Sequence, residues 1–184
     1  MIPFRRKKFL ALGSFIFFVG IIFQITSACV QEITPENSQQ IDLPTEFSCL
    51  PSPSDSQTAR VFSVIDGDTI KIQLGDNKIN VRYIGINAPE LDSEEREIAE
   101  EALKFNQQLV ENQTVTLYRD TSETDRFGRL LRYVFVGDLF INYEMVRMGY
   151  ARQRDYPPDS ACKHLFIQAQ EEAISQRRGI WKSE

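Results

Sequence analysis

Residues 59–86 read ARVFSVIDGDTIKIQLGDNKINVRYIGI, and this stretch decides the fold. Apolar and polar residues alternate over 59–65 and over 69–74, and the same pattern resumes over 78–86. The short polar sequences DGD and GDN separate the three segments, as turns separate the strands of a meander. The sequence therefore predicts three hairpin-connected strands, which need further strands to close a sheet around a core.

A helix is predicted directly after the third strand. Residues 92–112 are dense in helix-forming side chains, with apolar residues spaced along one face. Asp92 and Glu95 stand in the arrangement of a capping box, which predicts a helix start at Asp92.

Two further strands and two further helices are predicted downstream. They cover, in chain order, residues 114–118, 130–136, 141–148 and 161–178. Gly149 and Gly179 directly follow the two helices and are expected to end them. The predicted fold class is α+β, a five-stranded OB-type antiparallel β-barrel with about three packed helices.

The N-terminal 28 residues have the pattern of an export signal. Four basic residues at 5–8 precede an uncharged run from 9 to 28. That run is also long enough to cross a bilayer, so an uncleaved anchor is an alternative. The small residues before Cys29 fit either a signal-peptidase site or a bacterial lipobox, in which Cys29 is lipidated. We expect an exported protein, either secreted or attached to the cell envelope as a lipoprotein.

Residues 29–58 are rich in Pro, Ser, Gln and Thr and have no sustained periodicity, which predicts a flexible linker. One domain is then expected over 59–182. Besides Cys29, the chain has only Cys49 and Cys162. In an oxidising compartment these two can pair and pin the linker to the domain, and two free thiols are the alternative.

The charge of the chain argues against a simple polyanion-binding protein. Its formal net charge is −5, and removal of residues 1–28, which hold four basic and no acidic residues, lowers it to −9. A broad positive surface is therefore not expected. Nucleic acid would have to be bound by locally placed cations and a bound metal.

The first group of candidate site residues could hold a hard cation. Asp68 offers a carboxylate, Asn87 an amide oxygen and Ala88 its main-chain carbonyl, a mixture that suits calcium. For Asp66 we expect a turn role instead, because Asp-Gly pairs commonly form hairpins. Pro89 holds the residue before it in extended geometry, so that these oxygens are presented outward.

The second group could act on a phosphate. Glu90 is a candidate general base for water, its alternative role being an acidic flank of the following helix. Arg82 and Arg129 could hold a phosphate through bidentate contacts, although each by itself would more often form a structural salt bridge. Together with a cation, these groups indicate metal-assisted phosphodiester hydrolysis.

Five segments, IDGDTIKI, VRYIGINAPE, DRFGR, GYAR and RGIW, together resemble the thermonuclease, or staphylococcal nuclease-like, family over about residues 59–181. The resemblance implies a calcium-dependent nuclease on DNA and RNA that leaves 3′-phosphate ends. It implies that Asp68 is a calcium ligand, that Arg82 and Arg129 bind phosphate, and that Glu90 orients the attacking water.

The chain departs from this family at two ligand positions. Asn87 stands where the best-known members have a second aspartate ligand, and Ala88 replaces a threonine whose carbonyl is used. A lower calcium affinity or a broader metal preference is expected. Tyr156 resembles a tyrosine of the nucleotide pocket, and Asp125 resembles a helper residue near the metal loop.

The leading hypothesis is an exported calcium-dependent nuclease with DNA and/or RNA as substrate and no obligate protein partner. Glu90→Gln or Arg82→Ala is then expected to lower turnover by orders of magnitude with little unfolding. One alternative is a cell-surface module that binds nucleic acid or protein and has lost useful catalysis. Another is a membrane-tethered structural lipoprotein, which predicts no response to metal.

Overall fold

The computed structural model describes residues 48–50 and 56–183. The expected export signal over 1–28, the lipidation candidate Cys29 and most of the expected linker lie outside the described residues. In the part of the chain that is described, no helix is long and apolar enough to span a bilayer.

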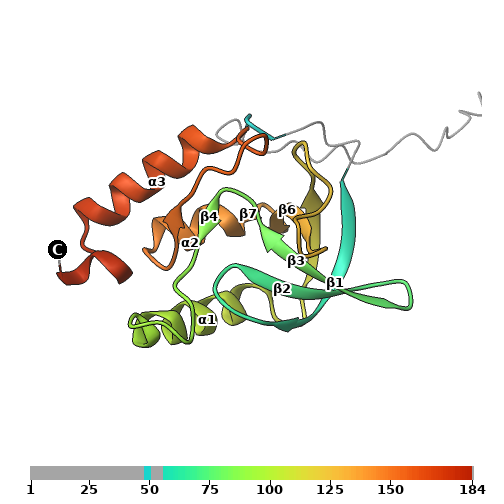
Figure 1. Ribbon diagram of the computed structural model, residues 1–184, viewed down its shortest axis with the longest axis horizontal. Helices are drawn as coiled ribbons and strands as arrows, with labels where there is room; N and C mark the ends of the chain where they lie inside the picture. The colour runs from blue at the N-terminus through green and yellow to red at the C-terminus, as the bar shows by residue number, and fades with distance from the viewer. Residues whose placement is uncertain (1–47, 51–55, 184) are drawn as a thin grey trace, which may run out of the picture. The chain divides into compact units, whose positions relative to one another are not determined.

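Five strands form a closed barrel at the positions predicted from the alternation of apolar residues (Figure 1). They are β1 (Gln57–Val64), β2 (Thr69–Leu74), β3 (Asn77–Tyr83), β5 (Thr114–Tyr118) and β6 (Leu130–Val136). Their order is β3-β2-β1-β5-β6, and a pairing between β3 and β6 closes the barrel. The short strand β7 (Leu139–Phe140) pairs with the end of β6.

The predicted five-stranded OB-type barrel is confirmed, and one of its seams is parallel where the prediction was an antiparallel sheet. β3 and β6 run parallel, with Val81 opposite Leu130 and Tyr83 opposite Arg132. The reason is topological, because an odd number of strands cannot alternate in direction all the way around a closed barrel. One pair of neighbours must run in the same direction, and it is the pair that joins the two ends of the sheet.

The third predicted strand is also shorter than expected. β3 ends at Tyr83, and a separate strand β4 (Ile86–Asn87) pairs with β8 (Arg152–Gln153) outside the barrel. Between them Gly85 has a φ of +79°, and a Cβ there would lie 2.4 Å from the ring of Phe166. Glycine therefore lets the chain bend over this ring and leave the barrel, which carries β4 to the candidate site.

Three helices pack around the barrel, as predicted. They are α1 (Arg96–Val110), α2 (Ile141–Arg147) and α3 (Lys163–Ser175), and the chain ends in a 3₁₀ turn over Gly179–Ser183. Figure 1 shows α2 between the barrel and α3. The core joins these layers: in particular, the rings of Phe135 and Phe140 stack at 4.4 Å, and Phe140 contacts Phe166 of α3.

Two predicted helix ends are wrong. α1 starts at Arg96 and not at Asp92, and the N–H of Glu95 is accepted by the Ser93 hydroxyl in a turn that replaces the expected capping box. α3 stops at Ser175, ahead of the predicted end at Arg178, since Arg177 rather than Gly179 takes the first positive φ after the helix.

A disulfide joins the short segment 48–50 to the start of α3. It links Cys49 to Cys162, which are 113 residues apart in sequence. Cys162 is fully buried, and its N–H donates to the hydroxyl of Tyr133 on β6. The bond therefore attaches the N-terminal segment to the hydrophobic core.

Candidate active site

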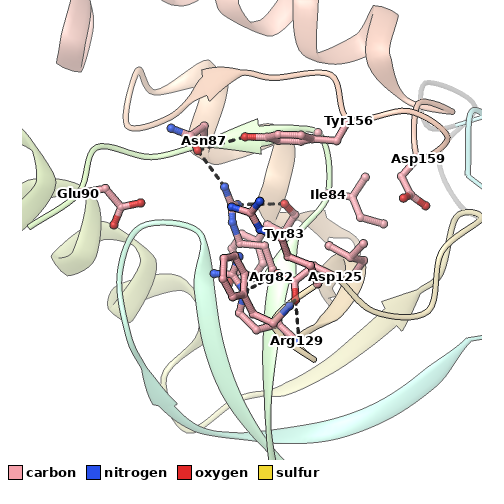
Figure 2. A pocket seen from close by; sticks show the side chains of 13 residues that line it. Arg82, Tyr83, Ile84, Asn87, Glu90, Asp125, Arg129, Tyr156 and Asp159 are labelled. Atoms are coloured by element: carbon pink, nitrogen blue, oxygen red, sulfur yellow. Dashed lines mark hydrogen bonds and ion pairs between the residues drawn. The ribbon is translucent and has the colours of Figure 1, made fainter.

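A pocket of about 640 Å³ opens beside the parallel seam of the barrel (Figure 2). Six residues that the sequence singled out line it: Arg82, Asn87, Glu90, Asp125, Arg129 and Tyr156. The other two, Asp68 and Ala88, do not line the pocket but lie in contact behind Arg82 and Asn87. The fold thus brings together side chains from β3, β4 and three loops.

Arg82 forms the inner wall of the pocket. It lies on β3 opposite Thr69 of β2, which brings it beside Asp68 at the start of that strand. Its Nη1 is 3.0 Å from Asp68 Oδ2, and the two side chains are only 11% and 6% exposed. Nη1 also donates to the Tyr83 carbonyl, and Nη2 donates to Asn87 Oδ1. Arg82 is therefore half of a buried ion pair as well as a wall of the pocket.

The carboxylate of Asp68 accepts two further hydrogen bonds. Its Oδ2 accepts the N–H of Ala88 at 2.6 Å, and its Oδ1 accepts the Thr69 hydroxyl at 3.1 Å. Burial raises the pKa of the Asp68 carboxyl, and this effect outweighs the opposing effect of the Arg82 guanidinium. The protein partners of Asp68 therefore compensate only part of the loss of solvation of its ionised form.

The turn between β1 and β2 positions Asp68. The Asp66 carboxylate accepts the Asp68 N–H at 2.9 Å, which is the turn role expected for Asp66. A Cβ on Gly67 would lie 2.6 Å from the Cβ of Ala88, so only glycine lets this turn approach the segment that follows β4.

Arg129 is oriented by its own loop. Asp125 accepts the Arg129 Nε–H at 2.7 Å and the backbone N–H groups of Arg129 and Phe127. Burial raises the pKa of the Asp125 carboxyl, but these hydrogen bonds together outweigh it and hold the pKa below its usual value. Among the described residues, neither Nη nitrogen of Arg129 has a hydrogen-bond acceptor, so this end of its guanidinium is available to a ligand.

Glu90 and Tyr156 lie at the rim. Glu90 is exposed, its carboxylate makes no hydrogen bond or ion pair with any described residue, and Figure 2 shows it at one edge of the pocket. Tyr156 is 46% exposed, and its hydroxyl donates to Asn87 Oδ1 at 3.4 Å. The guanidinium of Arg154 lies 5.9 Å from the Tyr156 ring centre.

Comparison with known proteins shows the family of this chain. Residues 80–183, more than half of the chain, match the family described as Staphylococcal nuclease homologue. The chain belongs to this family. Thermonuclease of Staphylococcus hyicus is 34% identical to it over 135 residues, which are 72% of this chain and 80% of that protein.

Two more relatives of the staphylococcal nuclease homologue family extend the comparison. Thermonuclease of Staphylococcus intermedius is 36% identical over 125 residues, covering 66% of this chain and 74% of the relative. Endonuclease YncB of Bacillus subtilis (strain 168) is 34% identical over 122 residues, which cover 64% of this chain and 58% of the relative.

The residues present fit a hard cation in kind. Asp68 Oδ1 and the Ala88 carbonyl are oxygen donors of the type that calcium prefers. The two residues are in contact, since the Ala88 N–H donates to Asp68 Oδ2. Among the described residues, no group of three His, Cys, Asp or Glu side chains could hold a metal. A cation in this member of the family would therefore take most of its six to eight oxygens from water and substrate.

Sequence reasoning missed Asn106 of α1. It is fully buried, accepts the Tyr83 hydroxyl at 2.9 Å and donates to the carbonyl of Asp66 at 2.9 Å. It thereby braces both the turn that carries Asp68 and the end of β3. The sequence does indicate such a role, because a polar side chain between Ala102 and Val110 on the apolar face of a helix requires a buried hydrogen-bond partner.

A second missed feature is the exposed ring of Phe127, in the same loop as Arg129. It is 69% exposed and lines the pocket, with the guanidinium groups of Arg126 and Arg129 at 4.7 and 5.5 Å from its centre. An exposed aromatic residue between two arginines in a polar loop was the signal in the sequence.

Proposed function

We propose that this protein is an exported, calcium-dependent nuclease that hydrolyses phosphodiester bonds of DNA and/or RNA and leaves 3′-phosphate ends. The observation that carries the proposal is the gathering of Arg82, Arg129 and an unpaired Glu90 around one pocket. Two cations and a free carboxylate are the groups that hydrolysis of a phosphate diester requires. The family membership and its named thermonucleases support the same activity.

The two arginines leave different N–H groups of their guanidiniums free for a phosphate. Within the protein, Arg82 makes its contacts through Nη1 and through one hydrogen of Nη2. No described residue accepts a hydrogen bond from its Nε–H or from the second hydrogen of Nη2. Nε and Nη2 form one edge of the guanidinium. Arg129 uses Nε, which leaves its Nη1 and Nη2 end open. Each arginine can therefore make a bidentate contact and stabilise the extra negative charge of the transition state.

Glu90 is the base of the proposed reaction. Its carboxylate accepts a proton from the attacking water, whose oxygen forms a bond to phosphorus as the bond to the 5′-oxygen breaks. The departing 5′-oxygen takes up a proton from solvent, so the products are a 3′-phosphate and a 5′-hydroxyl. Because no protein group competes for this carboxylate among the described residues, Glu90 is free to orient the water.

Calcium would be held by Asp68 and the Ala88 carbonyl, with Asn87 as the third predicted ligand. When bound, it would lower the pKa of the attacking water and neutralise charge on the phosphate. Because Asp68 also contacts Arg82, the carboxylate that would hold the cation also holds the phosphate-binding arginine.

Export is proposed from the N-terminal sequence, with attachment through a lipidated Cys29 as the alternative to release. The disulfide between Cys49 and Cys162 supports a place outside the reducing cytosol, where such bonds form and persist.

The test is cleavage of single-stranded DNA and of RNA by the purified protein in calcium and in chelator. Labelling of the new 5′-hydroxyl ends by a polynucleotide kinase, without prior phosphatase treatment, would identify the predicted product. Cleavage that is unaffected by chelator would contradict calcium dependence. Binding without any cleavage, in calcium or magnesium, would favour the alternative of a binding module that has lost catalysis.

A further inference from the structure

Asn87 lies between the innermost arginine of the pocket and the aromatic ring at its rim. Figure 2 shows the amide with Tyr156 on one side and Arg82 on the other. Its Oδ1 accepts a hydrogen bond from Arg82 Nη2 at 3.1 Å and another from the Tyr156 hydroxyl at 3.4 Å. Its Nδ2 faces the Ala88 carbonyl at 3.4 Å. The amide is thus in use at both ends.

The number of lone pairs decides what else this side chain can bind. An amide oxygen has two lone pairs, whereas a carboxylate offers about four acceptor positions on two oxygens. Oδ1 of Asn87 already accepts two hydrogen bonds from the protein, one from Arg82 and one from Tyr156. A cation could bind Oδ1 only if one of these hydrogen bonds broke, and the Nδ2 end carries hydrogens and cannot bind a cation.

We propose that Asn87 is a positioning residue for substrate binding and not a metal ligand, with its amide fixing Arg82 and Tyr156 relative to each other. The inference rests on the proposed nuclease function, and it replaces the predicted role of Asn87 as a calcium ligand by a role in substrate binding. A nucleic acid strand would meet an arginine fork and an aromatic ring whose spacing is fixed in advance.

The backbone makes Asn87 suited to this role. It belongs to β4 and pairs with Arg152 of β8, so its main chain is held by the short sheet outside the barrel. Arg82 belongs to the barrel, and Tyr156 follows β8. One amide therefore connects an arginine of the barrel, five residues before it, to a tyrosine 69 residues after it in the sequence.

The contact with Asn87 also fixes the direction in which the free N–H groups of the Arg82 guanidinium point. The contact of Nη2 with Asn87 and of Nη1 with Asp68 fix the guanidinium plane at two points. The free Nε–Nη2 edge is thereby kept ready for a phosphate, at a lower entropic cost of binding. Tyr156 keeps an exposed ring face on which a base can stack.

The first experiment measures calcium binding alone, by isothermal titration calorimetry, so that no turnover is needed. Asn87→Ala is expected to leave the calcium affinity within about twofold of wild type. The matched control Asp68→Asn should weaken it by about tenfold or more, since it removes the charged ligand. A tenfold loss in Asn87→Ala would overturn the inference and would leave the nuclease proposal standing.

The second experiment measures binding of a fluorescein-labelled single-stranded oligodeoxynucleotide in EDTA, by anisotropy. Asn87→Ala is expected to weaken binding about fivefold to tenfold, because Arg82 and Tyr156 lose their shared partner. Tyr156→Phe removes only the hydroxyl and should weaken binding less. The double variant should bind no more weakly than Asn87→Ala, since both changes remove the same link. Unchanged binding in Asn87→Ala, or additive losses, would contradict a positioning role.

The two proposals fail in different ways. If Asp68→Asn leaves calcium binding unchanged, the metal assignment of the proposed function is wrong, while the oligonucleotide experiment still decides the role of Asn87. Urea unfolding of each variant shows whether a loss of affinity comes from a loss of folded protein. Tyr156→Phe alters an exposed side chain and so provides a second probe of the link that is not expected to unfold the domain.

Discussion

Arg82→Ala is expected to destabilise the fold as well as the reaction, contrary to the sequence-based expectation of little unfolding. The change would leave Asp68, which is 4% exposed, without the guanidinium that lies 3.0 Å from its carboxylate. Removing one partner of a buried ion pair typically costs about 3–5 kcal/mol. We therefore predict a loss of this size in the free energy of unfolding, equivalent to a decrease of a hundredfold to several thousandfold in the folding equilibrium constant.

The assay is urea unfolding in the presence of EDTA, so that bound metal does not alter the comparison. Glu90→Gln is the matched control, because Glu90 is exposed and its carboxylate has no partner among the described residues. The stability of this variant should stay within about 0.5 kcal/mol of wild type. Adding Asp68→Asn to Arg82→Ala removes the stranded charge and should recover part of the loss. A loss below about 1 kcal/mol in Arg82→Ala would refute the reasoning.

Three further changes test the structure elsewhere. Asp125→Asn should lower the free energy of unfolding near neutral pH. In urea titrations at about pH 3 the difference from wild type should shrink, because the low pKa of Asp125 gives stability that is lost on protonation in acid. Replacing Cys49 and Cys162 by serine should lower the free energy of unfolding by about 2–5 kcal/mol, because the bond closes a long loop. Gly85→Ala should cost about 2–4 kcal/mol in thermal unfolding, from its positive φ and a close contact with a core ring.

The strands of the barrel could be predicted because their signal is local. Alternation over residues 59–86 and the two turns within it depend on neighbouring residues alone. The parallel seam between β3 and β6 was missed, although the count of five strands already requires it. The break at Gly85 could not be seen in the same way, because its cause is the ring of Phe166 on a distant helix.

The candidate site was predicted as a set of residues, and their partners were not. Residue types and motif order placed Arg82, Glu90 and Arg129 together, and all three line one pocket. The burial of Asp68 depends on the backbone of the segment after β4, and the contact of Asn87 with Tyr156 depends on β8. Such long-range contacts leave no periodic signal in one sequence. The role of each of these side chains could therefore be assigned only once the fold was known.

The most direct test of the central claim is the single-turnover rate of single-stranded DNA cleavage at saturating calcium, in wild type and in Glu90→Gln. The account predicts that the wild-type rate is lost in chelator and that the variant is slower by about a hundredfold or more, with its fold and calcium affinity intact. Equal rates in the two proteins would contradict the assignment of Glu90 as the base and, with it, the proposed mechanism.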